Sequence, residues 1–337
     1  MDKQVNNDGV VIVKYRITDE LVNKPIPFLR AYSRIKPSEG IDAVYIDDQP
    51  KTPAKSTIRF DQTGEHTVRI LLRNSRVIPD DFLRHAEHIY SVEIPESVTE
   101  IKDMAFRWTH LQCPPALPPH LVVIGKCAFD DAYVGVDCVQ VPDSVVWIGN
   151  EAFNGVPHII VGKSYREWLE YLDCYDEVTI PADNPYVEAR DGFFIEKATR
   201  SVKGILKKAF DDSEGVTIRL PEGVPSFDGS PTSGLFRHFD NASLYIPGSV
   251  EKVDLFTRCP NIEFAEGVKE ITLNGYDTSK HLILPSTLER LALSCCELAE
   301  LSIPAGSVIH VPDEETAKKI LDCPGFNKQV KIIIDGN

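Results

Sequence analysis

The 337-residue sequence predicts a mainly β fold with short helices and turns, a solenoid of stacked coils behind a small, β-sandwich-like N-terminal domain. The main observation is a segment that occurs three times, in which a short apolar run ends at a proline and an Ala-Phe pair follows at a fixed distance. The prolines are Pro95, Pro118 and Pro142, and the phenylalanines are Phe106, Phe129 and Phe153. A period of about 23 residues is typical of a solenoid, whose units bury their apolar faces only against neighbouring units.

Residues 1–76 carry no copy of the repeat and are predicted to form the small β domain. Val10–Ile17 is rich in β-branched residues and Ala43–Ile46 is a second apolar run, so we predict a strand in each. The runs Ser56–Phe60 and His66–Leu72 flank a short connection that contains a glycine, which predicts a hairpin. Several short strands in this order favour a sandwich-like arrangement.

From residue 77 to residue 311 the chain is predicted to form the solenoid, with a short strand in each unit. The strand ends at the proline, because the missing N–H then falls at the end of the hydrogen-bonded ladder. The alanine allows neighbouring coils to approach closely, and the phenylalanines are expected to stack as an internal column. Burial of each ring contributes about 1.5–3 kcal/mol. We therefore expect Phe129 to be fully buried between Phe106 and Phe153.

Beyond Phe153 the repeat becomes irregular. Ser164–Leu172 has its apolar residues on one helical face and begins with a capping-box pattern, so it is a predicted helix. Further strands are expected to end at Pro181, Pro221, Pro247, Pro285 and Pro304. The later copies lose the Ala-Phe pair, although Leu255-Phe256 is expected to replace it once. Shorter units predict a thinner convex side in the C-terminal half.

Residues 312–337 are predicted to cover the last coil with a helix and a strand, because a terminal repeat needs a polar cap. The helix is placed at Asp313–Leu321, with Ala317, Ile320 and Leu321 facing inward. Two acidic pairs, Asp80-Asp81 and Glu314-Glu315, are interpreted as the first turns of helices, where carboxylates interact favourably with the helix dipole.

The pattern I-P-x-S-V-x-x-I-G-x-x-A-F, best preserved in Asp143–Phe153, resembles the BspA-like leucine-rich repeats, the Treponema pallidum class, of bacterial proteins. The likeness runs from Ile78 to Val311 and implies a leucine-rich-repeat solenoid. It also implies that residues 183–206 form a variant unit with a protruding hairpin, for which Asp191-Gly192 is a suitable turn. The family further implies a secreted or cell-surface bacterial protein that acts in cell adhesion and host interaction.

Composition excludes several other classes of function. A formal charge of −15 disfavours a nucleic-acid surface, which needs a basic stripe. No run reaches the roughly 20 apolar residues of a membrane-spanning helix. The first residues lack the apolar core of a secretory signal, which leaves two alternatives, a cytoplasmic protein or a leader that was removed. The expected extracellular or cell-surface location follows from the resemblance alone. We therefore expect no nucleic-acid partner and no membrane insertion.

The sequence offers no catalytic or metal-binding motif. The eight cysteines contain no C-x-x-C pair and are interpreted as small, mostly reduced core residues. They are Cys113, Cys127, Cys138, Cys174, Cys259, Cys295, Cys296 and Cys323. His85 and His88 are spaced to share a helical face, but no further ligand completes a metal site. We therefore predict a non-enzymatic protein without a cofactor.

The remaining candidate site is a row of outward-facing strand residues, one per coil, since side chains alternate along a strand. The row comprises Glu93, Ala116, Gln140, Thr179, Arg219, Tyr245, Glu263, Ile283 and Ser302. We select as binding residues Arg219, Tyr245, Glu263, Ile283, Gln140 and Glu93, because aromatic and arginine side chains often anchor interfaces. Two competing interpretations are a solvated sheet face without a partner and an Ile283 that turns inward.

The sequence thus predicts a protein-binding or adhesion module whose partners are proteins of the host extracellular matrix or mucus. The first alternative is a carbohydrate-binding surface protein that uses the N-terminal domain or the hairpin at Tyr186–Ile195. The second is an enzyme with its site in the N-terminal domain, which a pocket lined by convergent carboxylates or histidines would support.

Overall fold

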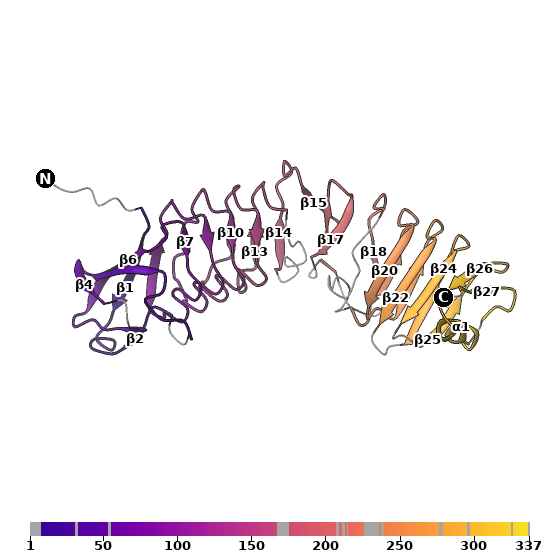
Figure 1. The fold of residues 1–337 in the computed structure, drawn as a ribbon, viewed down its shortest axis with the longest axis horizontal. Helices are drawn as coiled ribbons and strands as arrows, with labels where there is room; N and C mark the ends of the chain where they lie inside the picture. Colours follow the sequence, from indigo (N-terminus) through magenta and orange to yellow (C-terminus); the bar gives the residue numbers. More distant parts are fainter. Residues whose placement is uncertain are drawn as a thin grey trace. The chain divides into compact units, whose positions relative to one another are not determined.

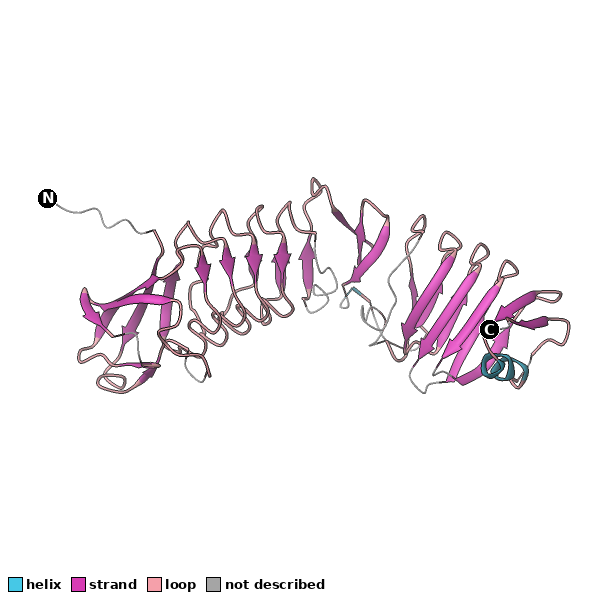
Figure 2. Ribbon diagram, viewed as in Figure 1, coloured by secondary structure: helices cyan, strands magenta, loops and turns pink. Residues whose placement is uncertain are grey.

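The structure is a computed structural model that describes residues 8–30, 33–52, 55–166, 175–206, 209–210, 213, 215–225, 236, 239–275, 279–294, 297–324 and 326–335. The chain divides into two compact units, unit 1 (Met1–Tyr186) and unit 2 (Val187–Asn337). Figure 1 labels their strands, and Figure 2 shows one short helix, close to the C-terminus of the described chain. The predicted mainly β solenoid is confirmed.

Unit 1 begins with a five-stranded sheet in the order β4-β3-β6-β1-β8, whose neighbours are all antiparallel. The strands are β4 (Gln49–Lys51), β3 (Ile41–Ile46), β6 (Gly64–Leu72), β1 (Val10–Ile17) and β8 (Ile89–Glu93). The predicted strands in the first two apolar runs are therefore confirmed as β1 and β3. Because β8 belongs to the first complete repeat, the N-terminal segment and the solenoid share this sheet. The sandwich and the boundary at residue 76 stay predictions.

The predicted hairpin between Ser56–Phe60 and His66–Leu72 is wrong. β5 (Thr57–Ile58) pairs instead with β2 (Ile26–Pro27) in a separate two-stranded ladder. β6 has its two edges occupied by β1 and β3, so it offers no edge to the preceding run. The two runs still meet through their side chains, since the rings of Phe60 and His66 lie 4.6 Å apart.

The coils of unit 1 contribute to two parallel sheets and one turn side, although residues 102–122 contain no strand of their own. A four-stranded parallel sheet has the order β12-β10-β9-β7, and a three-stranded parallel sheet has the order β11-β13-β14. The strands of the first are β7 (Val77–Ile78), β9 (Glu100–Ile101), β10 (Val123–Ile124) and β12 (Trp147–Ile148). Those of the second are β11 (Cys138–Gln140), β13 (His158–Ile160) and β14 (Glu177–Thr179).

The Ala-Phe pairs form the turn side and place their rings in the core. Phe129 is 0 % exposed, and its ring centroid lies 5.0 Å from that of Phe106 and 5.2 Å from that of Phe153. The ring planes deviate by 8° and 1°, so the three rings form a parallel column. The predicted burial and stacking of Phe129 are confirmed.

The turn side depends on two residues per coil with left-handed backbone. The first column is Asp81, Met104, Cys127 and Glu151, and the second is His85, Trp108, Asp131 and Gly155, all with positive φ. Between coils, alternate backbone N–H groups donate to the next coil, as Phe106 N does to the Ala128 carbonyl at 2.7 Å. His85, His88 and Asp80-Asp81 therefore lie in turns, and their predicted helical positions are wrong.

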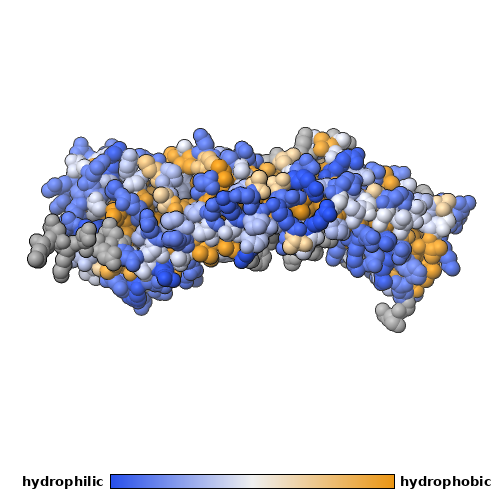
Figure 3. Space-filling view, turned by 90° about the horizontal axis from the view of Figure 1, so that it is seen from above, coloured by the Kyte–Doolittle hydropathy of each residue, from blue (hydrophilic) through white to orange (hydrophobic). Residues whose placement is uncertain are grey.

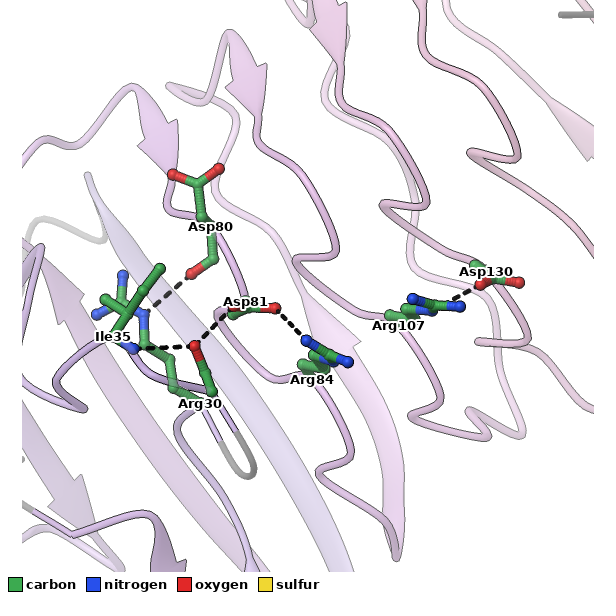
Figure 4. Close-up of polar contacts among 8 residues, drawn as sticks. Arg30, Ile35, Asp80, Asp81, Arg84, Arg107 and Asp130 are labelled. Carbon is green, nitrogen blue, oxygen red and sulfur yellow. Dashed lines mark hydrogen bonds and ion pairs between the residues drawn. The ribbon is translucent and has the colours of Figure 1, made fainter.

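The loop at Arg30 ties the N-terminal segment to the first coil (Figure 4). Arg30 is 3 % exposed; its Nε donates to the Asp80 carbonyl at 3.0 Å, and Nη1 donates to two carbonyls of its own loop. Beside it, Ser33 Oγ donates to Asp81 Oδ2 at 2.7 Å, and Arg84 Nη1 donates to Asp81 Oδ1 at 3.2 Å. A buried guanidinium that satisfies several carbonyls fixes this junction.

Unit 2 begins with an antiparallel sheet of β15 (Val187–Arg190), β16 (Phe193–Glu196) and β17 (Ser201–Ile205). Its first turn is Asp191-Gly192, where φ is 52° and 81°, as a tight hairpin turn requires.

The coils that follow in unit 2 contribute to two parallel sheets, with a largely aliphatic core between them. The sheet that we call the front sheet has the order β18-β19-β21-β23-β25, and the back sheet has the order β20-β22-β24-β26-β27. The front strands are β18 (Thr217–Arg219), β19 (Ser243–Ile246), β21 (Asn261–Phe264), β23 (Ser279–Ile283) and β25 (Glu297–Ser302). The back strands are β20 (Lys252–Thr257), β22 (Glu270–Gly275), β24 (Arg290–Ser294), β26 (Val308–Val311) and β27 (Lys331–Ile334).

The C-terminal helix α1 (Glu314–Leu321) begins after Asp313, whose carboxylate accepts the N–H of Thr316 at 2.7 Å. Ala317 and Ile320 are buried as predicted, but Leu321 is 55 % exposed. Thr316 takes the inward place instead, because it lies one helical turn before Ile320.

Two further predictions concern the Leu255-Phe256 pair and the helix at Ser164–Leu172. Leu255-Phe256 does not replace the Ala-Phe pair, because both residues lie in β20 with only Leu255 buried. Most of the predicted helix at Ser164–Leu172 lies outside the described residues, and so do Cys174, Cys295 and Cys296.

Candidate binding face

The outer side of the front sheet carries two in-register rows of side chains, and we call this surface the front face. The first row is Thr217, Ser243, Asn261, His281 and Glu300, and the second is Arg219, Tyr245, Glu263, Ile283 and Ser302. The residues between them, such as Leu244 and Ile262, are buried in the core. A groove of about 520 Å³ lies over the face, lined by members of both rows.

The alternation that creates the face is a direct consequence of strand geometry. In β21 the order is exposed, buried, exposed, buried, so Asn261 and Glu263 point out while Ile262 and Phe264 pack inward. The parallel register then places equivalent residues of successive coils side by side, about 4.8 Å apart. Five residues of the second row, predicted from sequence, are therefore neighbours on one sheet.

The second row combines an aromatic contact with exposed charge and exposed apolar surface. The Arg219 guanidinium carbon lies 4.5 Å from the centroid of the half-buried Tyr245 ring, a cation–π contact. Ile283 is 52 % exposed, so the competing expectation that it turns inward is wrong. Within the described residues, neither Arg219 nor Glu263 forms an ion pair.

The first row is polar throughout and was missed by the sequence reasoning. Asn261 Nδ2 donates to Ser243 Oγ at 3.3 Å, and His281 Nδ1 lies 3.4 Å from Glu300 Oε2. The signal was present, because each of these residues precedes a predicted row member by two positions, which the period of a strand puts on the same face.

The outer side of the back sheet differs from the front face in its electrostatics. Lys252 Nζ lies 2.7 Å from Glu270 Oε2, and these residues are in-register partners on adjacent strands. The hydrogen bond from Lys252 lowers the pKa of the Glu270 carboxyl. Arg290 and His310 both contact Asp335, at 3.2 and 2.8 Å. The same coils thus pair their charges across strands on the back and leave Arg219 and Glu263 unpaired on the front.

The other predicted row residues do not join this face. Gln140 and Thr179 lie in unit 1 on β11 and β14, with Ile160 of β13 between them in register. Sequence reasoning missed Ile160, because no proline marks the end of its strand. Glu93 lies in the antiparallel N-terminal sheet and pairs with Lys14 at 2.5 Å, and Ala116 lies outside the strands. The single row expected from sequence is thus divided among separate sheets.

Residues 76–164 match the family model described as the BspA type leucine rich repeat region, in 6 copies. This part of the chain is a BspA-type leucine-rich-repeat region. The stacked coils continue beyond the match, through β25 and β26. No curated protein matches the chain in sequence.

Among solved structures, the chain is similar to bacterial leucine-rich-repeat proteins at low identity. A leucine-rich repeat protein from Eubacterium ventriosum is 15% identical, with 63% of this chain and 72% of that chain covered, at a TM-score of 0.39. The pneumococcal vaccine antigen PcpA is 13% identical, with 80% and 86% covered, at a TM-score of 0.35. A leucine-rich repeat protein from Bacteroides ovatus is 13% identical, with 83% and 90% covered, at 0.33.

Metal-binding clusters and reactive cysteines were the other kinds of site to consider in the described ranges. No group of three or more His, Cys, Asp or Glu side chains there is arranged to hold a metal ion. Cys127, Cys259 and Cys323 are buried, as predicted for small core residues, whereas Cys113 and Cys138 are exposed. Burial, together with the hydrogen bond to Glu151, raises the pKa of Cys127 to about 11. Across the described helical residues, nothing is long and apolar enough to cross a membrane.

Exposed apolar side chains are scattered over the molecule. On the side drawn in Figure 3, hydrophobic residues form separate patches among hydrophilic ones. The large exposed ones are Val122, Val134, Tyr186, Ile283, Val308, Leu321 and Ile334. Isolated apolar residues are ordinary on a soluble protein. Ile283 differs because it lines a groove together with Glu263 and Glu300, and Glu263 is its in-register neighbour.

Proposed function

We propose that this BspA-type chain is a non-enzymatic protein-binding module and that the front face of unit 2 is its contact surface. The observation that carries the proposal is a single in-register row that holds two unpaired charges, Arg219 and Glu263, and the exposed Ile283 next to Glu263. On the back sheet the same coils neutralise their charges in register. A partner that covers Ile283 and pairs with both charges gains apolar burial and two charge-assisted contacts at little ordering cost.

We also propose a cell-surface or secreted setting, with adhesion to a host protein as the role. Support comes from the BspA-type repeat itself, since extended solenoid faces are used for binding. The partners we propose are proteins of the extracellular matrix or of mucus. Gln140 and Glu93 remain proposed contacts outside the front face, with Gln140 exposed on β11.

The test is a binding measurement on a panel of purified matrix proteins and mucins immobilised on a biosensor. The Arg219→Ala, Tyr245→Ala double variant is expected to keep its fold and to lose at least about tenfold in affinity, or roughly 1.4 kcal/mol, for the captured partner. The matched control is Lys252→Ala with Glu270→Ala, which alters the back sheet of the same coils and should bind as the unmodified chain does. Unchanged binding by the front-face variant would mean that the site lies elsewhere, with the Asp191 hairpin next.

Carbohydrate binding is the second candidate, and one observation favours it. Tyr186 is 39 % exposed and its ring carries the Arg166 guanidinium carbon at 4.9 Å. An exposed aromatic ring with a cation on one side offers its other side for stacking. A glycan array separates this function from protein binding: a signal that Tyr186→Ala abolishes supports it, and an array without signal excludes it for the glycans tested.

A further inference from the structure

We infer that the partner of the front face is an extended protein segment with an acidic and a basic residue about four positions apart. The separation of four positions follows from the strand spacing of about 4.8 Å. The inference rests on the function proposed above, because it specifies the chemistry of that partner. It follows from three properties of the face: the order of its charges, its length and its small width.

The charges are separated along the face. Arg219 lies on β18, the outermost strand at one end of the front sheet. Glu263 on β21 and Glu300 on β25 flank β23, which carries Ile283; Glu300 also contacts His281 of β23 at 3.4 Å, whereas Glu263 forms no ion pair within the described residues. A carboxylate of the partner suits the exposed Arg219 guanidinium, which can donate two parallel hydrogen bonds. A lysine or arginine suits the other end, since its aliphatic stem can lie on Ile283 while its charge reaches a glutamate.

The spacing of the strands sets the spacing of the partner's charges. Arg219 and Ile283 are three strand intervals apart, or about 14 Å at about 4.8 Å per interval. An extended chain that crosses the strands advances about 3.4 Å per residue, so residues i and i+4 are also about 14 Å apart. Residue i+2 faces the same way and lies over the region of Tyr245 and Glu263. A small or apolar residue fits there, because Tyr245 is already half-buried.

A second copy of this chain is the competing occupant. A row that is positive at one end and negative at the other is complementary to itself after a two-fold rotation. The size of the face argues against it. Five strands span about 24 Å or less, and the two rows are about 7 Å apart, which gives an area between the rows of less than about 200 Å². A stable protein interface needs about 800 Å² from each partner. A slender segment fits that area, and a second copy does not.

The experiment is a selection of displayed random peptides of about nine residues, long enough to cross the face. It is run on the full chain, on Arg219→Glu, on Glu263→Lys with Glu300→Lys, and on the back-sheet control Lys252→Glu. The unmodified chain and the control are expected to enrich peptides with an acidic and a basic residue four apart. Arg219→Glu should replace the acidic residue by a basic one, and the Glu263, Glu300 variant should replace the basic residue by an acidic one.

Affinity is then measured by fluorescence anisotropy for one enriched peptide and for its acid-to-amide version. On the unmodified chain the amide version should bind at least about fivefold more weakly, and on Arg219→Ala the two should bind alike, as a double-mutant cycle requires for a direct contact. Enrichment that is the same on all four proteins overturns the inference. So does a concentration-dependent dimer that Arg219→Glu dissociates and Arg219→Glu with Glu263→Arg restores, because the occupant is then a second copy.

The outcomes separate this inference from the proposed function. If the matrix panel yields a partner that the Arg219, Tyr245 double variant loses, while the selections show no acid–base pattern, the function stands and the inference fails. If neither the panel nor the selection responds to front-face variants, both fail.

Discussion

Successive coils pack on one another differently in unit 1 and in unit 2. In unit 1 the chain turns back through an Ala-Phe corner, with two residues of left-handed backbone per coil and a column of parallel rings. In unit 2 the strands of the second parallel sheet are longer, with six residues in β20 and in β22 against two in each of β9, β10 and β12, and the core between the sheets is largely aliphatic. One unit is held together by aromatic rings at its corners, and the other by two opposed sheets.

The difference has a consequence for the surfaces. A turn side exposes irregular backbone and few in-register neighbours, whereas each sheet of unit 2 exposes rows of residues with fixed spacing. On the back sheet those rows are used for cross-strand ion pairs, such as Lys252 with Glu270. On the front face His281 and Glu300 make one such contact, whereas Arg219 and Glu263 form no ion pair within the described residues. These two unpaired charges mark the candidate contact surface.

The largest expected effect is on the ring column. Phe129→Ala removes the middle ring and should cost about 3–5 kcal/mol of unfolding free energy, because a cavity is left between two fixed coils. Hydrogen exchange should show lost protection in the strands of unit 1, around β9 to β12, with β22 and β24 unchanged. The matched variant is Leu273→Ala, also 0 % exposed, which should cost about 2–5 kcal/mol and loosen unit 2 instead. Equal loss of protection in both units after either substitution would contradict the division between them.

The second effect concerns a requirement that both units share, the close approach of successive coils. A Cβ at Gly162 in unit 1 would lie 2.1 Å from the Pro142 carbonyl oxygen, and one at Gly248 in unit 2 would lie 1.8 Å from that of Glu266. Both backbones would have to move, so Gly162→Ala and Gly248→Ala should each cost about 1–3 kcal/mol. Thermal unfolding measures both. If Gly162→Ala lowered the unfolding temperature and Gly248→Ala left it unchanged, only the coils of unit 1 would be tightly stacked.

The sequence predicted the features that depend on short-range patterns. The proline-terminated strands and the buried ring column were predictable because strand alternation and the repeat period are visible in the residues. The second sheet of unit 2 was missed although its signal is present, since Val253 and Leu255 alternate with polar residues, as do Ile271 and Leu273. The left-handed positions could not be recognised, because residues as different as Met104, Cys127 and Trp108 occupy them.

The candidate site was predictable only in part. Counting back from Pro221, Pro247 and Pro285 gave the second row, and the structure brings its members together. The absence of ion pairs at Arg219 and Glu263 in the described structure was not predictable, because pairing depends on the register between strands that are far apart in sequence. The same dependence explains why Glu93, on an antiparallel strand, does not join Gln140.

The third prediction introduces valine at one position in each unit, and the two substitutions are expected to change the unfolding free energy in opposite directions. Asp131→Val places a β-branched residue at φ 47° on a unit 1 turn, which should cost about 1–2 kcal/mol. Asn274→Val places it on β22, beside its in-register neighbour Phe256, and should stabilise unit 2 by up to about 1 kcal/mol. Chemical denaturation of each variant gives the two free energies. Destabilisation by both substitutions would argue against a regular back sheet.

The smallest expected effect is a difference in pH dependence between the N-terminal sheet and the C-terminal helix. In the N-terminal sheet burial lowers the pKa of His66, but the hydrogen bond to Asp47 at 2.6 Å, the contact with the Gln62 carbonyl and the charges of Asp47 and Asp61 together raise that pKa overall. A raised histidine pKa stabilises the fold below the unfolded value of about 6.5 and loses that contribution as pH rises through the folded value. At the other end, hydrogen bonds from the Thr316 N–H and hydroxyl lower the pKa of Asp313. The stability that the Asp313 carboxylate contributes is fully present above its unfolded pKa of about 3.9 and is lost as the pH falls through its folded pKa.

Raising the pH from about 6 to above 8 should therefore loosen β6 of unit 1, by less than about 1 kcal/mol after solvent screening of the half-exposed Asp47, and leave α1 unchanged. The measurement is amide hydrogen exchange of the unmodified chain and of the Asp47→Asn variant at the same pH. The difference in β6 protection between the two proteins should shrink as the pH rises. Asp313→Asn keeps a capping side chain but removes the titration, so acid should destabilise α1 less in that variant than in the unmodified chain. An alkaline loss of protection in α1 that Asp47→Asn removes would mean that the two ends are not separate, since neither His66 nor Asp47 lies in unit 2.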